Sequence, residues 1–126
     1  MADPSLTHVP VAGDCNCRCE ECPIVPAPPV TADQVRARAE AERPAVLVLT
    51  GPGEPTLHRD LPRLLHAARR GGAGDVALVT NGRALAYPRT AARIAGLRPA
   101  AVAVTLRHPD AATHDGLVRV LSLIHI

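Results

Sequence analysis

Residues 45–57 read Ala45-Val-Leu-Val-Leu-Thr50-Gly-Pro-Gly-Glu-Pro-Thr-Leu57, an apolar run followed directly by a loop rich in glycine and proline. A continuous apolar run of this length is typical of a β-strand that is covered on both faces of a sheet. In the loop, glycines let the backbone approach a ligand, prolines stiffen the turn, and Glu54 supplies a fixed hydrogen-bond acceptor. The stretch therefore predicts a buried strand that ends in a candidate ligand-binding loop.

Strand and helix patterns precede this stretch. A proline-rich connector lies between them, and a capping box formed by Thr31 and Gln34 marks the start of the helix. Pro10 interrupts the first strand, which places that strand near the edge of the sheet. The elements expected before residue 45 are a weak strand at Leu6–Ala12, the connector at Pro23–Val30 and a helix from Thr31 to about Glu42.

The same alternation continues after the stretch. The elements expected there are a helix from Asp60 or Leu61 to Arg70, a buried strand at Val76–Thr80, a short helix at Pro88–Gly96, a buried strand at Ala101–Leu106, and a helix from Asp110 to about Val120. Strands that alternate with helices through short connections are parallel and joined by right-handed crossovers. The sequence therefore predicts an α/β domain of about four βα units, either an opened barrel or a doubly wound sheet.

In sheets of this kind, ligands bind at the carboxyl ends of the strands. Applied to the expected strands, this rule selects four loops, at residues 13–22, 51–57, 81–84 and 107–110. In the third, Gly82 permits a positive φ, and the side chains of Thr80 and Asn81 can meet hydroxyl or amide groups. At the fourth, Thr105 and Arg107 offer a hydroxyl and a guanidinium to a carboxylate or a ribose.

The first of these loops contains every cysteine of the chain, within eight consecutive residues. Cys15, Cys19 and Cys22 have the spacing C-x3-C-x2-C, which brings three thiolates to one soft-metal centre and leaves one coordination position open. With Cys17 included, the four thiols could instead close a structural zinc site. Disulfides are disfavoured, because neighbouring cysteines of this run are too close in sequence to bridge without strain.

Composition narrows the classes of function further. The chain of 126 residues has a net charge of +2, and its arginines are scattered, so there is no electrostatic case for nucleic acid as a partner. Tyr87 is the only aromatic residue, which leaves Leu, Val, Ile and Ala to build a thin core. Neither a signal peptide nor an apolar run of the ~20 residues that span a membrane is evident. A cytoplasmic protein without membrane contact is expected.

Three motifs in one order resemble the radical S-adenosylmethionine superfamily. They are C-x3-C-x2-C after the first expected strand, Gly51-Pro-Gly-Glu-Pro-Thr-Leu57 after the second and Thr80-Asn-Gly82 after the third, and the resemblance covers roughly Leu6 to Val120. It implies a partial (β/α) barrel. It also implies that the iron-binding thiolates of a 4Fe-4S cluster come from Cys15, Cys19 and Cys22, with Cys17 as a bystander.

The resemblance further implies how the second cofactor is bound. S-adenosylmethionine would occupy the remaining iron, near Gly51, Gly53 and Glu54, while strand-end residues contact its ribose or carboxylate; these are Thr80, Asn81, Thr105 and Arg107. Reductive cleavage would yield a 5′-deoxyadenosyl radical that abstracts hydrogen from a substrate the sequence does not identify. An electron donor such as flavodoxin or ferredoxin is implied as a partner.

The chain departs from the family pattern in several places. Glu21 stands where an aromatic residue commonly precedes the last cysteine, which places a carboxylate beside an anionic cluster. A complete barrel needs roughly 250 residues, so residues 1–120 are expected to be the N-terminal part of a core domain that is truncated at its C-terminus. Leu121–Ile126 resemble translated adapter sequence and are expected to be a non-native tail. The competing interpretations are a zinc-stabilised binding module and an incomplete product that binds neither partner.

Overall fold

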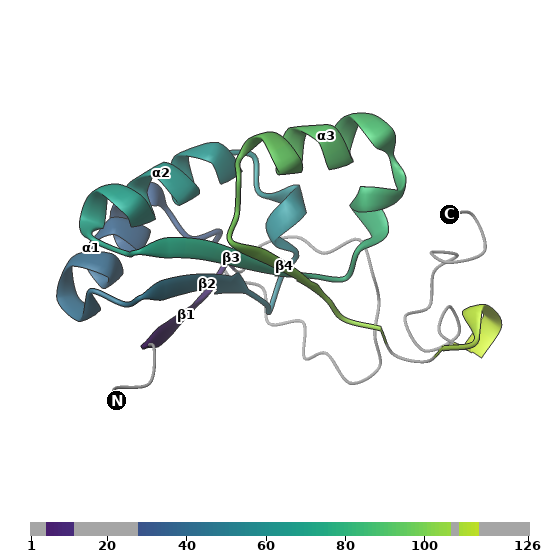
Figure 1. The fold of residues 1–126 in the computed structure, drawn as a ribbon, viewed down its shortest axis with the longest axis horizontal. Coiled ribbons are helices and arrows are strands. Elements are labelled where there is room, and N and C mark those ends of the chain that lie inside the picture. Colours follow the sequence, from purple (N-terminus) through teal and green to yellow (C-terminus); the bar gives the residue numbers. More distant parts are fainter. Residues whose placement is uncertain (1–4, 12–27, 107–108, 114–126) are drawn as a thin grey trace.

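A computed structural model describes residues 5–11, 28–106 and 109–113 of the chain. Its four strands form one parallel sheet in the order β1-β2-β3-β4 (Figure 1). The strands are β1 (Leu6–Pro10), β2 (Val46–Thr50), β3 (Asp75–Thr80) and β4 (Ala101–Val104). Neighbours in the chain are therefore neighbours in the sheet.

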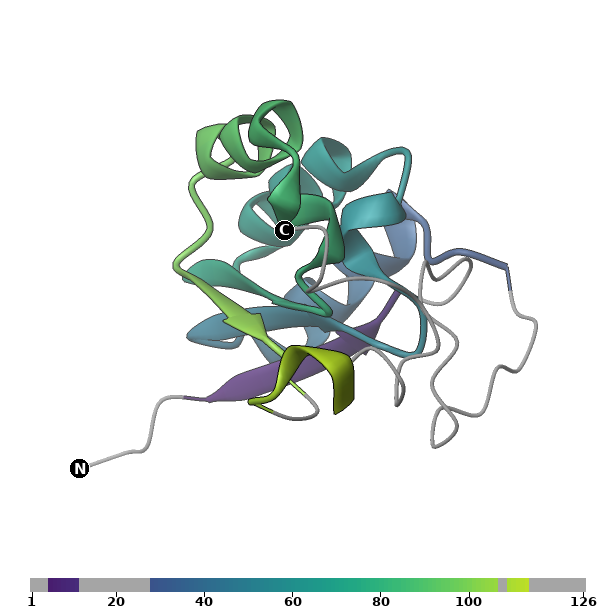
Figure 2. The ribbon, with the colours of Figure 1, turned by 90° about the vertical axis from the view of Figure 1, so that its right-hand side faces the viewer.

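Helices connect the strands and lie on one side of the sheet, as Figures 1 and 2 show. They are α1 (Ala32–Glu42), α2 (Leu61–Gly71) and α3 (Pro88–Gly96), with short 3-10 turns η1 (Pro55–Leu57) and η2 (Arg83–Ala86) in the loops after β2 and β3. A doubly wound sheet needs a reversal of strand order, and the described strands have none. The expected α/β domain of parallel strands and connecting helices is confirmed, and the sequential order of the described strands is compatible with part of a βα barrel.

Local sequence signals place the helix ends. The capping box is present at α1, where Thr31 Oγ1 accepts from Gln34 N at 3.2 Å and Gln34 Oε1 accepts from Thr31 N at 2.9 Å. Gly72 ends α2 with a φ of +110°, a conformation that suits glycine at a helix C-terminus. The predicted bounds of α3, Pro88 and Gly96, are confirmed. These ends follow from chemistry within a few residues of each helix terminus.

The core lies between the sheet and the helices and is entirely aliphatic. Strand register places Val9, Leu49 and Leu78 in one row across the sheet, and all three are buried. Val35 from α1 and Leu64 from α2 belong to the same buried cluster. Tyr87 is 62% exposed, so the only aromatic ring contributes little to the core. The predicted core of Leu, Val, Ile and Ala is confirmed in the described residues.

A strand begins at Ala101 as predicted, but the predictions that it is buried and that it extends to Leu106 are wrong. The strand β4 ends at Val104, and all four of its residues are exposed. In the described part of the chain β4 pairs only with β3, so it is an edge strand with little cover on either face. The expected position of β1 at the other edge is confirmed. Of the helix expected at residues 110–120, only the first residues are described, where Thr113 N donates to Asp110 Oδ2 at 2.9 Å.

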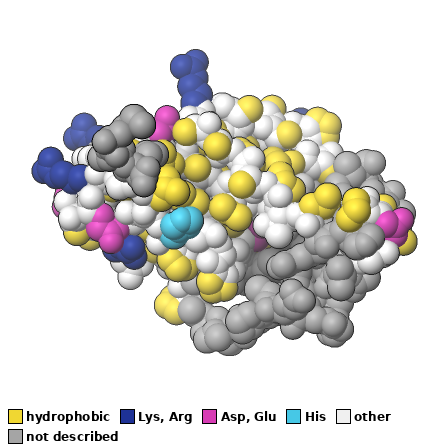
Figure 3. Space-filling model, turned by 60° about the horizontal axis from the view of Figure 1, so that its bottom comes forward, with side chains coloured by type: hydrophobic (Ala, Val, Ile, Leu, Met, Phe, Trp, Pro, Cys, Tyr) yellow, Lys and Arg dark blue, Asp and Glu magenta, His cyan; other side chains and the backbone are white. Residues whose placement is uncertain are grey.

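The face of the sheet away from the helices is also rich in apolar side chains. Figure 3 turns the bottom of Figure 1 toward the viewer and shows hydrophobic groups spread over this side. The register assigns Leu6, Val46 and Ala77 to this face, together with Val48. Leu6 is 57% exposed, whereas Val48 is buried. In a closed barrel the corresponding face points into the interior.

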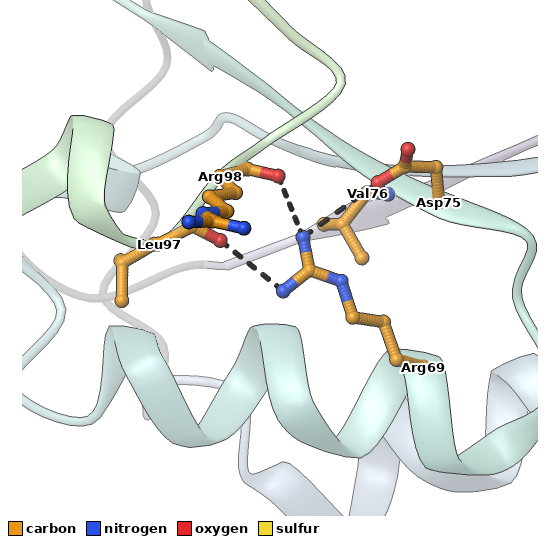
Figure 4. Close-up of polar contacts among 5 residues, drawn as sticks. All are labelled: Arg69, Asp75, Val76, Leu97 and Arg98. Carbon is orange, nitrogen blue, oxygen red and sulfur yellow. Dashed lines mark hydrogen bonds and ion pairs between the residues drawn. The ribbon is translucent and has the colours of Figure 1, made fainter.

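Arg69, in the last turn of α2, ties α2 to the residues that follow α3 and to the start of β3 (Figure 4). Its guanidinium donates from Nη1 to the carbonyl of Leu97 at 3.2 Å and from Nη2 to that of Arg98 at 2.8 Å. Nη2 also lies 3.6 Å from Asp75 Oδ1 at the start of β3. Leu97 is the C-cap of α3 and Arg98 follows it, so this one side chain holds the chain where it leaves the helix.

We expect Arg69→Ala to lower the free energy of unfolding by about 1 kcal/mol, since charged hydrogen bonds are lost but the group is partly screened by solvent. Arg69→Lys should recover little, because an ammonium cannot reproduce the planar fork. Arg70→Ala is the matched control, because Arg70 is the exposed neighbour in the same turn. Urea unfolding measures all three variants, and equal losses for Arg69→Ala and Arg70→Ala would contradict the role of this contact.

Candidate functional site

The loops after β2 and β3 meet at the carboxyl ends of the strands, around the side chain of Glu54. Glu54 follows Gly53, whose φ is +90°, and it caps the 3-10 turn η1. Glu54 is only 3% exposed, although carboxylates are seldom buried unless they have partners. A buried carboxylate at this place therefore needs hydrogen-bond donors from the surrounding loops.

Both oxygens of the Glu54 carboxylate accept hydrogen bonds from the protein. Within its own loop, Oε1 accepts from Thr56 N at 3.2 Å and from Thr56 Oγ1 at 2.7 Å. From the end of β3, Oε1 accepts from the Thr80 hydroxyl, and Oε2 accepts from Asn81 N at 2.8 Å. One buried carboxylate thus joins the loop after β2 to the end of β3.

The Thr80-Asn81-Gly82 turn is held by further local bonds. Gly82 N donates to Thr80 Oγ1 at 3.1 Å, and Arg83 N donates to Asn81 Oδ1 at 3.0 Å. Gly82 has a φ of +79°, and a Cβ there would lie 2.7 Å from Val104 Cγ1. The prediction that Gly82 adopts a positive φ is confirmed. Both its conformation and its close approach to β4 require glycine.

The residues on either side of the cysteine-containing segment are also fixed at the carboxyl ends of the strands. Val11 N donates to the carbonyl of Thr50 at 2.9 Å, which continues β1 alongside the end of β2. Val30 N donates to the carbonyl of Val11 at 2.8 Å. The chain therefore leaves the sheet after Val11 and returns beside the same residue, close to where the Gly51–Leu57 loop begins.

The structure brings together six of the predicted site residues. Gly51 and Gly53 lie in the loop of Glu54, Thr80 and Asn81 donate to its carboxylate, and Thr105 N donates to the carbonyl of Thr80 at 2.9 Å; the six are Gly51, Gly53, Glu54, Thr80, Asn81 and Thr105. The remaining predicted residues lie outside the described part of the chain; they are Cys15, Cys19, Cys22 and Arg107, together with Cys17 and Glu21. Their roles stay predictions.

Sequence reasoning missed two residues of this region. Thr56 supplies two of the donors to Glu54, and the spacing Glu54-x-Thr56 at a turn that begins with Pro55 is a signal that could have indicated it. The second is His58, whose Nε2 lies 2.7 Å from the carbonyl oxygen of Val30. Val30 is 28 residues away in sequence, so no local pattern indicates this contact.

The described residues have further features that are not part of the hydrogen bonds around Glu54. An open hollow of about 480 Å³ lies between β1 and α1 and is lined by Val9, Pro10, Pro28, Val30, Gln34, Ala37 and Arg38.

In residues 5–11, 28–106 and 109–113, no group of three His, Cys, Asp or Glu side chains is placed to hold a metal ion. The helices in these ranges are all too short or too polar to cross a membrane.

Comparison with protein-family models gives no match for this chain, and comparison with curated protein sequences gives none either.

Proposed function

We propose that the chain is the N-terminal part of the core domain of a radical S-adenosylmethionine enzyme, with a partial (β/α) barrel of about four βα units. The observation that carries this proposal is that two loops, and the residues on either side of the cysteine-containing segment, lie together at the carboxyl ends of the strands. Glu54 ties the loop after β2 to the end of β3, and Val11 and Val30 bring both ends of the cysteine-containing segment to the neighbouring strand end. Ligands from distant parts of the sequence would therefore share one site.

The donor chemistry of these loops fits the proposed cofactors. Three thiolates, from Cys15, Cys19 and Cys22, would hold a 4Fe-4S cluster, because clusters of this kind prefer cysteine ligands. When bound, the cluster would supply the electron for reductive cleavage of S-adenosylmethionine to methionine and a 5′-deoxyadenosyl radical. A flavodoxin- or ferredoxin-like protein would act as electron donor.

The protein residues around the site would bind and orient S-adenosylmethionine. Gly51 and Gly53 have no side chain, so the backbone of their loop can approach the methionine part of the cofactor. Thr105 and Arg107 would contact its ribose or carboxylate. The carboxylate of Glu54 already accepts four hydrogen bonds within the protein, so its main contribution would be to hold the two loops in place. The protein thus supplies orientation while the cofactors supply the chemistry.

Anaerobic reconstitution with ferrous iron and sulfide tests this proposal. We expect a brown protein with about four irons per chain, and an electron paramagnetic resonance signal after reduction that changes when S-adenosylmethionine is added. Dithionite and S-adenosylmethionine should then release 5′-deoxyadenosine, measured by mass spectrometry. A colourless protein with one tightly bound zinc per chain would contradict the proposal and favour a zinc-stabilised binding module.

A further inference from the structure

His58 lies just after the turn η1 and makes a contact that the proposed function does not use. The ring is partly buried, with Nε2 2.7 Å from the carbonyl oxygen of Val30. Its other nitrogen, Nδ1, accepts a hydrogen bond from Asp60 N at 3.1 Å. The His58 imidazole thus connects the loop after β2 to Val30, where the chain returns to the sheet before α1.

The two partners determine how the ring is protonated in this contact. A backbone N–H can only donate, so Nδ1 has to be the acceptor nitrogen. A carbonyl oxygen can only accept, so Nε2 has to carry the hydrogen that it donates to Val30. The contact is therefore directional, and only a side chain with a donor at the position of Nε2 can replace it.

Val30 is held through both of its backbone groups. Its N–H donates to the carbonyl of Val11, and its carbonyl accepts from His58. His58 is thereby linked to the base of the segment between Val11 and Val30. Four residues before His58, Glu54 is bound to Thr80 and Asn81. The covalent chain from Glu54 to His58 joins these two groups of hydrogen bonds, so the end of β3 is linked to that base.

We propose that His58 is a positioning residue, which fixes the base of the cysteine-containing segment relative to the Gly51–Leu57 loop. This inference rests on the proposed function, because it assigns the cysteines to the same site as that loop. His58 itself ligates nothing in this proposal. By holding the ends of the segment in one place, it lowers the conformational entropy that is lost when the thiolates gather around a metal.

Co²⁺ is a suitable probe, because its thiolate absorption bands report metal binding whether the native centre is a cluster or zinc. Reduced, metal-free protein would be titrated anaerobically with Co²⁺. One net hydrogen bond contributes roughly 0.5–1.5 kcal/mol, so His58→Ala should weaken Co²⁺ binding about two- to twelvefold. His66→Ala is the matched control, because His66 lies exposed on α2. The Co²⁺ affinity of this variant should equal that of the wild type.

Two conservative variants separate the two hydrogen bonds of the ring. In His58→Gln, the amide nitrogen can reproduce the donor to Val30 but the acceptor for Asp60 N is lost. In His58→Asn, the short side chain can accept from Asp60 N but cannot reach Val30. We expect Gln to retain wild-type Co²⁺ affinity within about twofold and Asn to lose as much as Ala, which a one-hydrogen-bond difference predicts.

The titration is performed where urea unfolding shows every variant to be folded, so that a loss of global stability alone cannot change the affinity. Equal Co²⁺ affinities for the Gln and Asn variants, unchanged affinity of His58→Ala, or no Co²⁺ binding by the wild type would each overturn this inference. Failure of the proposed function gives a different result. The reconstituted wild type would then release no 5′-deoxyadenosine, while the Co²⁺ series would still separate Gln from Asn.

Discussion

Replacement of Glu54 by alanine is expected to lower the free energy of unfolding by about 3–5 kcal/mol, because buried donors are costly to leave unpaired. The carboxylate accepts from two backbone N–H groups, of Thr56 and Asn81, and from two threonine hydroxyls. The hydroxyls can rotate toward other acceptors, but the backbone groups cannot. Removal of the side chain also leaves a cavity, which adds to the cost. The shift of the urea midpoint at constant slope measures the loss.

The charge-neutral variant Glu54→Gln tests the geometry of the same site. One amide oxygen cannot serve both positions, so at least one donor, such as Asn81 N, would face the amide NH₂ group. We expect a loss of about 1–3 kcal/mol. Glu40→Ala is the control, because Glu40 is an exposed member of an ion pair with Arg36 within α1, and it should cost well under 1 kcal/mol. Equal stabilities for Glu54→Ala and Glu40→Ala would show that the buried carboxylate does not hold the loops.

Replacement of Cys19 by alanine is expected to abolish binding of the reconstituted cluster, whereas replacement of Cys17 should leave it largely intact. The reason is the spacing of Cys15, Cys19 and Cys22, which supplies three ligands without Cys17. Iron and sulfide content per chain, together with visible absorption, measures the outcome.

The two cysteine variants are a matched pair, since both remove one thiol from the same short segment. If both lose the cluster equally, the three-ligand assignment is wrong and a site built from all four thiols is favoured. If neither loses it, the cluster is not held by these residues. Circular dichroism of each apo-variant shows whether the fold is retained.

Local signals in the sequence predicted the helices well. The capping box at Thr31 and the paired glycines at the end of α2 act within a few residues, so their effect does not depend on the rest of the fold. The exposure of β4 could not be predicted in the same way. Its residues Ala101–Val104 read as an apolar run, and only the strand order shows that it lies at an edge.

The sequence predicted which loops form the candidate site, but not the contacts between their side chains. The rule that ligands bind at carboxyl ends of parallel strands selected Glu54, Thr80 and Asn81 without knowledge of their contacts. That the carboxylate points at Thr80 and Asn81, 26 and 27 residues later in the chain, is a tertiary result. The contact between His58 and Val30 is likewise determined by how two loops lie against each other.

The sequential strand order also has a consequence for how the chain folds. Each strand pairs with its neighbour in sequence, so a pairing closes only the loop between them, and such closures are faster when that loop is short. Pairing of β3 with β4 closes the stretch between Thr80 and Ala101, whereas pairing of β1 with β2 closes the longer stretch between Pro10 and Val46. We therefore expect β1, and with it the base of the cysteine-containing segment, to join the sheet last.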